Sequence, residues 1–329
     1  MKRFFDTVST DDVSPIANLI ASRWVDPAAI VRAWRASGNF VFEVTSSQGS
    51  NSFLRFNHAS ERTVEAIESE LAFIERATNG GIRAARALPS LDGKLVESIP
   101  TQMGTFHAVL FRRLEGEERE IDSLGEEGFE AWGQLMARLH TAGAGPRLAR
   151  PAWRDHIESA LEWIPADDQF SGAELEAAGR TMEELGSDER TFGLIHFDLE
   201  LDNIMWAETP GLIDFDDSAY YPFAADIAFA LNDLWDDRPG NIDFADARLA
   251  AFVRGYRSIR GLEESELVRL PLYLRLHNLI LIARLARALS EPIGNPPEWT
   301  TKLQAKLEHA IRTRQEDIRE HPLFAVRRQ

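Results

Sequence analysis

The sequence predicts an α+β protein with a small antiparallel sheet and one main helix near its N-terminus, followed by a larger, mostly helical part. Three observations support this fold class. Strand-like runs separated by turn-rich links occupy the N-terminal residues. Apolar residues at helical spacing dominate from Leu124 onward. Between Leu194 and Asp217 the pattern changes to a strand, a polar loop and a hairpin, and this is where we expect the functional residues.

The N-terminal elements follow from periodicity and turn residues. A leading helix over residues 11–24 carries Pro15 in its first turn, where proline is tolerated. The links after the first two strands, Ser37-Gly38-Asn39 and residues 46–51, are rich in turn-forming residues. Strands are expected at residues 30–36, 40–45, 52–56, 95–99 and 106–111, and an amphipathic helix at residues 61–77.

The C-terminal part is predicted to consist mainly of helices. Its apolar residues recur every three or four positions, as they do on the buried face of a helix. The expected helices cover residues 129–142, 153–163, 173–185, 243–256, 264–289 and 297–320.

Composition and charge restrict the function classes. The chain of 329 residues can bury a sizeable core and hold about two domains. It contains no cysteine, which excludes thiolate catalysis and cysteine zinc sites and fits a reducing compartment, so we expect a cytoplasmic protein. No signal peptide or membrane span is expected, because the N-terminus lacks an apolar core and Arg284 and Arg287 interrupt the most apolar run. The net charge of −17 argues against nucleic acid as a partner.

The polar loop and hairpin carry the groups that phosphoryl transfer needs. Asp198 and Asn203 lie in the loop, and the second strand of the hairpin ends at Asp214, so the hairpin should bring Asn203 and Asp214 together. Phosphoryl transfer needs a carboxylate to accept the proton of the attacking hydroxyl and oxygen ligands for magnesium. One of these two carboxylates, Asp198 or Asp214, would therefore accept the proton, and the other would bind metal together with Asn203. A calcium loop at Asp214, Asp216 and Asp217 is excluded, because the glycine turn and closing glutamate are missing.

The spacing His-x-Asp-x-x-x-x-Asn from His196 to Asn203, followed by residues 213–215 (Ile-Asp-Phe), resembles the aminoglycoside phosphotransferase and choline kinase superfamily. The resemblance implies a protein-kinase-like bilobal fold. Residues 1–113 would form the nucleotide-binding lobe, and residues 114–329 would form a helical lobe with the catalytic loop and the substrate site. It also implies ATP and Mg²⁺ as cofactors and a phosphotransferase that acts on an alcohol group of a small molecule. In that case Asp198 would be the catalytic base, and Asn203 and Asp214 would bind the metal.

The same resemblance assigns further residues to the nucleotide. Arg55 stands where kinases hold the phosphates with a lysine, and Glu70 best matches its helix partner, with Glu65 and Glu68 as alternatives. Without the resemblance, Arg55 would be interpreted as a surface residue of an edge strand. The expected nucleotide-binding residues are Ser37, Gly38 and Asn39 in a short phosphate loop, Arg55 and Glu70, and Arg112 and Leu114 in the hinge between the lobes.

Other residues near the catalytic loop either support it or depart from the superfamily pattern. The resemblance implies that His196 and Asp226 brace the loop, with Asp226 accepting backbone hydrogen bonds. Phe197 and Glu200 replace a glycine and a histidine that are common in the superfamily. Glu200 and Asp216 are candidate substrate contacts, because both place negative charge around the expected cleft.

The acidic residues lead to a hypothesis about the acceptor. Residues 167–184 and the segment after Asp214 are acidic, which favours an acceptor with an amine or ammonium group, such as an aminoglycoside or amino alcohol. The alternative is that this acid is only solvated surface charge. Two other functions stay open: a protein Ser/Thr kinase similar to the bacterial stress-response kinases of this superfamily, and a nucleotide-binding regulator without transferase activity. The sequence does not specify an oligomeric state.

Overall fold

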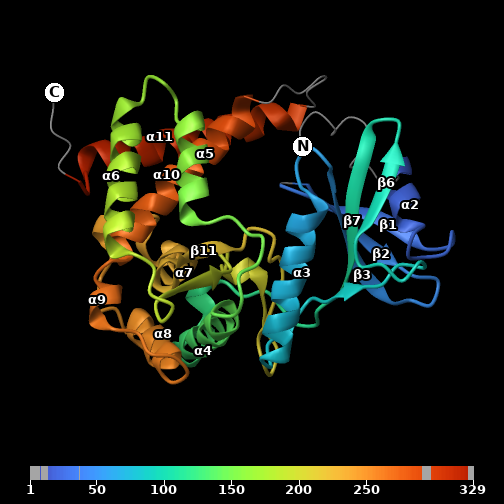
Figure 1. Cartoon of the computed structure of the whole chain (residues 1–329), viewed down its shortest axis with the longest axis horizontal. Coiled ribbons are helices and arrows are strands. Elements are labelled where there is room, and N and C mark those ends of the chain that lie inside the picture. The colour runs from blue at the N-terminus through green and yellow to red at the C-terminus, as the bar shows by residue number, and fades with distance from the viewer. Residues whose placement is uncertain (1–7, 9–13, 37, 291–297, 325–329) are drawn as a thin grey trace.

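The computed structural model describes Val8 and residues 14–36, 38–290 and 298–324. Figure 1 shows the N-terminal sheet on one side of the molecule and the C-terminal helices on the other, with helix α3 (Val64–Asn79) next to the sheet and facing those helices. This arrangement agrees with the predicted α+β architecture. Within the described residues, none of the helices combines the length and the apolar character that a membrane crossing requires.

The N-terminal sheet is antiparallel, with the strand order β1-β2-β3-β7-β5 and with β6 also paired to β7. Because side chains alternate along a strand, the sheet has two different faces. Phe42 and Phe56 lie in a core shared with helix α2 (Pro15–Ala21), whereas Val41 and Arg55 point to the opposite face. The strands are β1 Ile30–Ala36, β2 Phe40–Thr45, β3 Asn51–His58, β5 Ala87–Leu88, β6 Glu97–Thr101 and β7 Gly104–Arg112. Strand β3 is therefore an inner strand, so the interpretation of Arg55 as an edge-strand residue is wrong.

Helix α3 begins later than the predicted residue 61, because Thr63 is its N-cap. The Thr63 side chain accepts a hydrogen bond from the backbone N–H of Ala66 at 3.2 Å. The buried stripe of the helix carries Phe73 and Ile74 toward the core of the C-terminal part, and it also buries Glu70. The helix therefore connects the sheet to the larger core and presents one carboxylate to the space between them.

The C-terminal part is built from helices around one large apolar core. Its helices are α4 Glu126–Gly143, α5 Trp153–Trp163, α6 Gln169–Leu185, α7 Phe223–Ala230, α8 Ala247–Arg257, α9 Glu264–Leu267, α10 Leu270–Ser290 and α11 Glu298–Glu320. Short 3₁₀ turns cover Ile121–Ser123, Leu201–Asn203, Asn232–Trp235 and Pro239–Asn241. Helix α7 is buried on every side, as expected for a helix with apolar residues all round.

Other predicted helix bounds also differ from the structure, and two of the differences have a clear local cause. Helix α6 starts at Gln169 rather than at residue 173, because the Asp168 side chain caps it by accepting from the backbone N–H of Ser171 at 3.3 Å. The single helix predicted over residues 264–289 is two helices, α9 and α10. Pro271 lies at the second position of α10, where its missing N–H is tolerated, and it could not lie inside one continuous helix without breaking a hydrogen bond.

The predicted hairpin is present and orders the catalytic stretch. Strands β9 (Ile204–Met205) and β10 (Gly211–Leu212) are antiparallel, and β10 also pairs in parallel with β4 (Arg83–Ala84) from the N-terminal part. Strand β8 (Phe192–Ile195) pairs with β11 (Ala219–Pro222). The chain therefore enters the polar loop from a two-stranded sheet and leaves it into a three-stranded one, which fixes both ends of the loop.

Candidate active site

The turn that leads into Asp198 is held by the buried carboxylate of Asp226. Its two oxygens accept hydrogen bonds from the backbone N–H groups of His196 at 3.1 Å and Phe197 at 2.9 Å. His140 lies 3.0 Å from the same carboxylate through Nε2, and its Nδ1 lies 2.8 Å from the Tyr256 hydroxyl. Burial lowers the pKa of His140, so the neutral ring donates from Nε2 to Asp226 and accepts at Nδ1. The buried charge is thus fully engaged, as the low-dielectric surroundings require.

A glycine allows helix α4 to bring His140 this close. Gly143 lies against strand β8, and a Cβ at this position would be 1.9 Å from the carbonyl oxygen of Leu194. Any side chain at Gly143 would therefore push the helix away from the strand. The close approach places His140, one turn earlier, below the catalytic loop.

Phe197 has a backbone φ of 76°, in the left-handed region that favours glycine. This explains why relatives commonly carry glycine at the position. Packing compensates for the strained backbone here. The Phe197 ring lies edge-on to His156 at 5.0 Å and Phe229 at 5.1 Å, and the Arg284 guanidinium lies over it at 4.8 Å. Phe197, the residue before Asp198, is therefore held by contacts of both its backbone N–H and its side chain.

Asp198 is partly exposed and is oriented by Asn203. The Asn203 amide nitrogen donates to the Asp198 backbone oxygen at 2.8 Å and to its carboxylate Oδ2 at 3.0 Å. Burial raises the pKa of Asp198; His196 opposes this rise, and Asp217 and Asp202 add to it. A carboxylate with a raised pKa is a stronger proton acceptor, which suits a general base.

The two predicted metal ligands, Asn203 and Asp214, lie close to each other. The backbone N–H of Ile213 donates to the backbone oxygen of Asn203 at 3.1 Å, which fastens the residue before Asp214 to the loop. Asp214 itself has a left-handed φ of 58°. Both side chains line the same cavity. Because the amide nitrogen of Asn203 is directed to Asp198, its oxygen is left for a hard cation. Burial, followed by Asp216, raises the pKa of Asp214 to about 8.

Arg55 reaches this site from strand β3. Its Nη2 lies 2.5 Å from Glu70, and its Nη1 lies 3.2 Å from Asp214. Burial alone would lower the pKa of Arg55, but Glu70, Asp216 and Asp214 raise it above its ordinary value. The two other glutamates considered as partners, Glu65 and Glu68, are exposed. Glu70 thus holds the positively charged guanidinium of Arg55 in a fixed position at the acidic end of the cavity.

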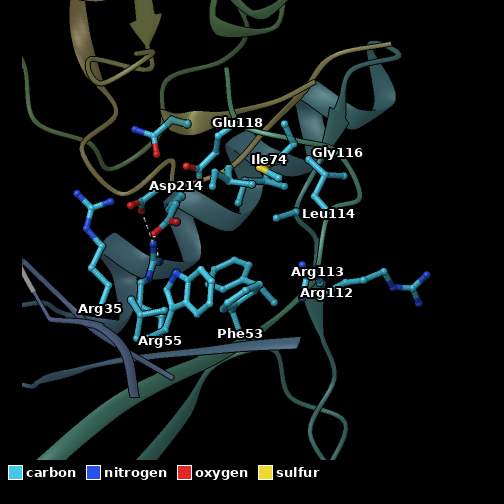
Figure 2. A pocket seen from close by; sticks show the side chains of 18 of the residues that line it. Arg35, Phe53, Arg55, Ile74, Arg112, Arg113, Leu114, Gly116, Glu118 and Asp214 are labelled. Atoms are coloured by element: carbon cyan, nitrogen blue, oxygen red, sulfur yellow. Dashed lines mark hydrogen bonds and ion pairs between the residues drawn. The ribbon is translucent and has the colours of Figure 1, made fainter. Parts of the chain in front are cut away.

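The cavity between the sheet and the C-terminal part has a volume of about 480 Å³. Figure 2 shows Arg55 and Asp214 at one end and the segment from Arg112 to Leu114 at another. Between these ends the walls are mainly apolar, contributed by Val41, Phe53, Ile74, Phe111, Met205 and Ile213. The predicted hinge residues Arg112 and Leu114 therefore line the same cavity as Arg55. An apolar slot with charged groups at one end is suited to a flat heteroaromatic ring that carries a phosphate chain.

In the predicted phosphate loop, residues 37–39, the structure differs from the prediction at Asn39. Ser37 lies outside the described residues. Gly38 has open space around it, but the buried Asn39 side chain donates to Asp216 Oδ2 at 2.7 Å and so is not free to contact a phosphate. Arg62 Nη2 lies 2.7 Å from the same Asp216 oxygen. The carboxylate of Asp216 is thus engaged by groups from the N-terminal part. These contacts do not support the prediction that Asp216 contacts substrate, which stays a prediction.

The prediction that the acid of residues 167–184 faces the cleft is wrong. Asp168 and Glu174 are buried in contacts with helix α11 and its C-terminal extension. Glu183 pairs with Arg154 on the surface. Arginines also pair with the later acidic residues: Arg284 lies 3.0 Å from Asp217 and Arg314 lies 2.6 Å from Asp237. No local sequence pattern indicates these pairings, because the arginines come from other helices.

Glu200 remains beside Asp198. Its Oε1 accepts a hydrogen bond from the Asn232 side chain at 2.8 Å. Burial, followed by the charge of Asp198, raises the pKa of Glu200 to about 8. Asp202 and Asp233 also interact with it electrostatically. The negative field predicted from the sequence is therefore concentrated in this small group around the catalytic loop.

Comparison with known proteins identifies the family. A family model described as APH, the phosphotransferase enzyme family, matches residues 31–262. The chain belongs to this family. This membership confirms the predicted superfamily and the predicted enzyme class, a kinase-type phosphotransferase that acts on a small molecule.

Two curated relatives illustrate the sequence similarity. Amicoumacin kinase of Bacillus subtilis (strain 168) is 26% identical over 263 residues, which cover 76% of this chain and 78% of that protein. A homoserine kinase of Methylobacterium nodulans is 32% identical over 218 residues, covering 60% of this chain and 64% of that protein. The match to the homoserine kinase thus spans less than two thirds of its length.

Solved structures confirm the predicted kinase-like fold class. Amicoumacin kinase hAmiN, in complex with AMP-PNP, Ca²⁺ and Ami, superimposes with a TM-score of 0.76 at 23% identity and 94% coverage of both chains. A microcompartment-associated aminopropanol kinase gives a TM-score of 0.71 at 23% identity, covering 94% of this chain and 99% of that one.

Proposed function

We propose that this phosphotransferase moves the γ-phosphoryl group of ATP to a hydroxyl group of a small molecule in a magnesium-dependent reaction. The observation that carries the proposal is the convergence of Asp198, Asn203 and Asp214 at the end of the cavity where the Arg55–Glu70 pair lies. Such a site works mainly by positioning the phosphates and neutralising their charge. Residues 1–113 and 114–329 are proposed as the two lobes, because β7 ends at Arg112 just before the chain crosses the cavity.

Asp198 is proposed as the catalytic base. Its carboxylate would accept the proton of the acceptor hydroxyl, and the hydrogen bond from Asn203 holds it in place. The raised pKa of Asp198 supports this role, because it makes the carboxylate a better proton acceptor. His196 and Asp226 would act through the loop, by holding the backbone that carries Asp198.

Asn203 and Asp214 would hold the metal. Within the described residues, no group of three His, Cys, Asp or Glu side chains could hold an ion alone. A metal at Asn203 and Asp214 would therefore complete its shell with phosphate and water oxygens, which is usual for magnesium. When bound, magnesium would supply positive charge to the phosphate oxygens. Arg55, held by Glu70, would contact the phosphate chain beside Asp214. The adenine base would lie in the apolar slot, with Gly38 near the phosphates and Arg112 and Leu114 near the ring.

The acceptor is proposed to carry an amine or ammonium group close to its reacting hydroxyl. Glu200, Asp202 and Asp233 interact electrostatically around Asp198, which supports a cationic ligand there. The names of two relatives point the same way, since both aminopropanol and homoserine carry an amine and a hydroxyl group.

The remainder of the acceptor is proposed to enter a second cavity, of about 170 Å³, between helices α5 and α10. His156 and Arg284 line this cavity and also contact the ring of Phe197, the residue before Asp198. The cavity is therefore next to the catalytic loop.

The decisive experiment compares binding and turnover in Asp198→Ala and Asp198→Asn. Both variants should keep the thermal shift caused by Mg-ATP, while turnover with a panel of amino alcohols, aminoglycosides and hydroxy-amino acids falls by about 10²–10⁴-fold. Asp214→Ala should instead lose the magnesium-dependent part of the thermal shift. Full turnover in Asp198→Ala, or loss of its nucleotide binding, would contradict the assignment.

A further inference from the structure

Strand β1 contains a β-bulge at Trp34, next to the large cavity. Ala33 pairs with Phe42 and Arg35 pairs with Val41, so Trp34 is an extra residue with no partner position on β2. A regular strand turns successive side chains to opposite faces, whereas a bulge redirects one of them. Trp34 and Arg35 consequently both line the cavity although they are consecutive.

The exposed ring of Trp34 stabilises this arrangement. It is 59% exposed and packs edge-on against Phe53 of strand β3, with ring centroids 5.3 Å apart. Phe53 itself forms part of the apolar wall of the cavity. The pair therefore anchors the bulge to the neighbouring strands and leaves the next side chain, Arg35, directed over the cavity.

Arg35 carries a positive charge that is only loosely held. Its Nη1 lies 3.8 Å from Asp202 Oδ2, and both side chains are more than half exposed. An exposed ion pair at this distance contributes little free energy, so a stronger anion can take the guanidinium. Figure 2 shows Arg35 and Arg55 extending toward the same end of the cavity, where Asp214 lies. The two arginines come from different strands, β1 and β3.

The short phosphate loop creates a need for such a charge. Glycine-rich loops bind phosphates through several free backbone N–H groups, but this loop has Gly38 as its glycine and the Asn39 side chain is committed to Asp216. Arg55 is already shared between Glu70 and Asp214. A triphosphate would therefore meet less positive charge from these groups than its own negative charge demands.

We propose that Arg35 is a second phosphate-binding arginine, which leaves Asp202 and contacts the triphosphate when nucleotide binds. This inference rests on the proposed function, because it requires the nucleotide to lie in the large cavity. The guanidinium can donate two parallel hydrogen bonds to phosphate oxygens, which a single ammonium group cannot do. Arg35 thus adds affinity for the phosphates and none for the base.

The test measures equilibrium binding of Mg-ATP and of adenosine to the full chain and to four variants. Arg35→Ala should weaken Mg-ATP binding by roughly 5- to 20-fold and leave adenosine binding unchanged. Arg35→Lys should recover part of the loss, and the difference between wild type and Arg35→Ala should shrink at high salt. Arg55→Ala is the positive control. Arg32→Ala is the matched control, because Arg32 is exposed on the same strand and is not among the residues that line the cavity.

Each outcome decides between specific alternatives. Equal affinity of wild type and Arg35→Ala for Mg-ATP overturns the inference while leaving the proposed function intact. An equal loss for Mg-ATP and adenosine also overturns it, since Arg35 would then act on the base, the ribose or the fold. If wild type binds adenosine and Mg-ATP with equal affinity, or binds neither, the proposed nucleotide site itself fails, and the role of Arg35 fails with it.

Discussion

Two regions of the site are held together in different ways. The floor consists of Asp226, His140, Phe197 and His277 beneath Asp198, and the mouth consists of Trp34, Arg35 and Asp202 above the cavity. In the floor, Asp226 and His140 are fully buried and joined by hydrogen bonds of 2.8–3.1 Å, and the ring of Phe197 is enclosed by aromatic side chains. At the mouth, Trp34, Arg35 and Asp202 are more than half exposed, and the ion pair between the last two spans 3.8 Å. The floor fixes the geometry of the catalytic loop before any ligand binds, whereas the Arg35 guanidinium at the mouth can move to contact a ligand.

The contrast follows from the cost of burying charge. A buried carboxylate is costly unless it accepts hydrogen bonds, so the bonds that Asp226 accepts fix the groups that donate them. An exposed pair pays no such penalty and is screened by solvent, so its geometry is weakly determined. Substitutions in the floor should therefore change stability and rate together, and substitutions at the mouth should change ligand affinity.

The largest effect is expected for Asp226→Ala. The change leaves two buried N–H groups and the His140 ring without their acceptor, and breaking such a network costs on the order of 3–5 kcal/mol in the free energy of unfolding. Chemical denaturation should show this loss, and turnover should collapse in parallel. Asp226→Asn keeps one carbonyl acceptor and should be intermediate. A loss below about 1 kcal/mol for Asp226→Ala would show that the floor is not fixed as described.

A pH-dependent effect, small near neutral pH and comparable to that of Asp226→Ala only at the acid end of the range, is expected for His277, which belongs to the floor. Its ring stacks on Phe229 at 4.6 Å, and burial, followed by Arg284 and Arg314, lowers its pKa to about 3. The unfolded chain binds the proton near the ordinary pKa of 6.5, so acid favours unfolding. Between pH 6.5 and about 3, this histidine should reduce stability by up to about 1.4 kcal/mol per pH unit.

Denaturation curves of wild type and His277→Phe across this pH range provide the check. The variant lacks the titrating ring, so its stability should fall less steeply as the pH decreases below 6.5. His156 and His140 stay in both proteins and their contributions cancel in the difference. Parallel curves for the two proteins would mean that folding does not lower the pKa of His277.

The smallest effect is expected for Glu200, at the edge of the site. Its pKa of about 8 means that it gains charge as the pH rises through that value. For an acceptor with a quaternary ammonium group, whose own charge is constant, kcat/KM should rise over this range. The ratio of wild type to Glu200→Gln should therefore increase several-fold between pH 7 and pH 9. A ratio that does not change with pH would remove Glu200 from acceptor binding.

Much of this architecture could be predicted from the sequence, because it depends on local signals. The bounds of strand β2 follow from alternation, and the β9–β10 hairpin follows from its Pro-Gly turn. The choice of Glu70 as the helix residue that meets Arg55 came from the resemblance to the superfamily, because periodicity alone left Glu65 and Glu68 as alternatives.

The features that could not be predicted depend on contacts between distant segments. Asp216 is engaged by Asn39, 177 residues away, and by Arg62, 154 residues away, and no periodicity reports such partners. Counting acidic residues likewise overlooked the arginines that neutralise them. Two local departures did leave a signal: a bulky residue replaces glycine at Phe197, and the strand at Trp34 does not keep its alternation. Both mark places where the backbone itself is unusual.

The most direct test of the contrast between floor and mouth is hydrogen–deuterium exchange with and without Mg-ATP. The backbone N–H groups of His196 and Phe197, bonded to buried Asp226, should exchange slowly in both states. The backbone N–H groups of Trp34 and Arg35 should exchange faster without nucleotide and become protected when Mg-ATP binds. The contrast between floor and mouth is contradicted if His196 and Phe197 exchange rapidly in the free protein and gain protection only on binding, or if Trp34 and Arg35 do not respond.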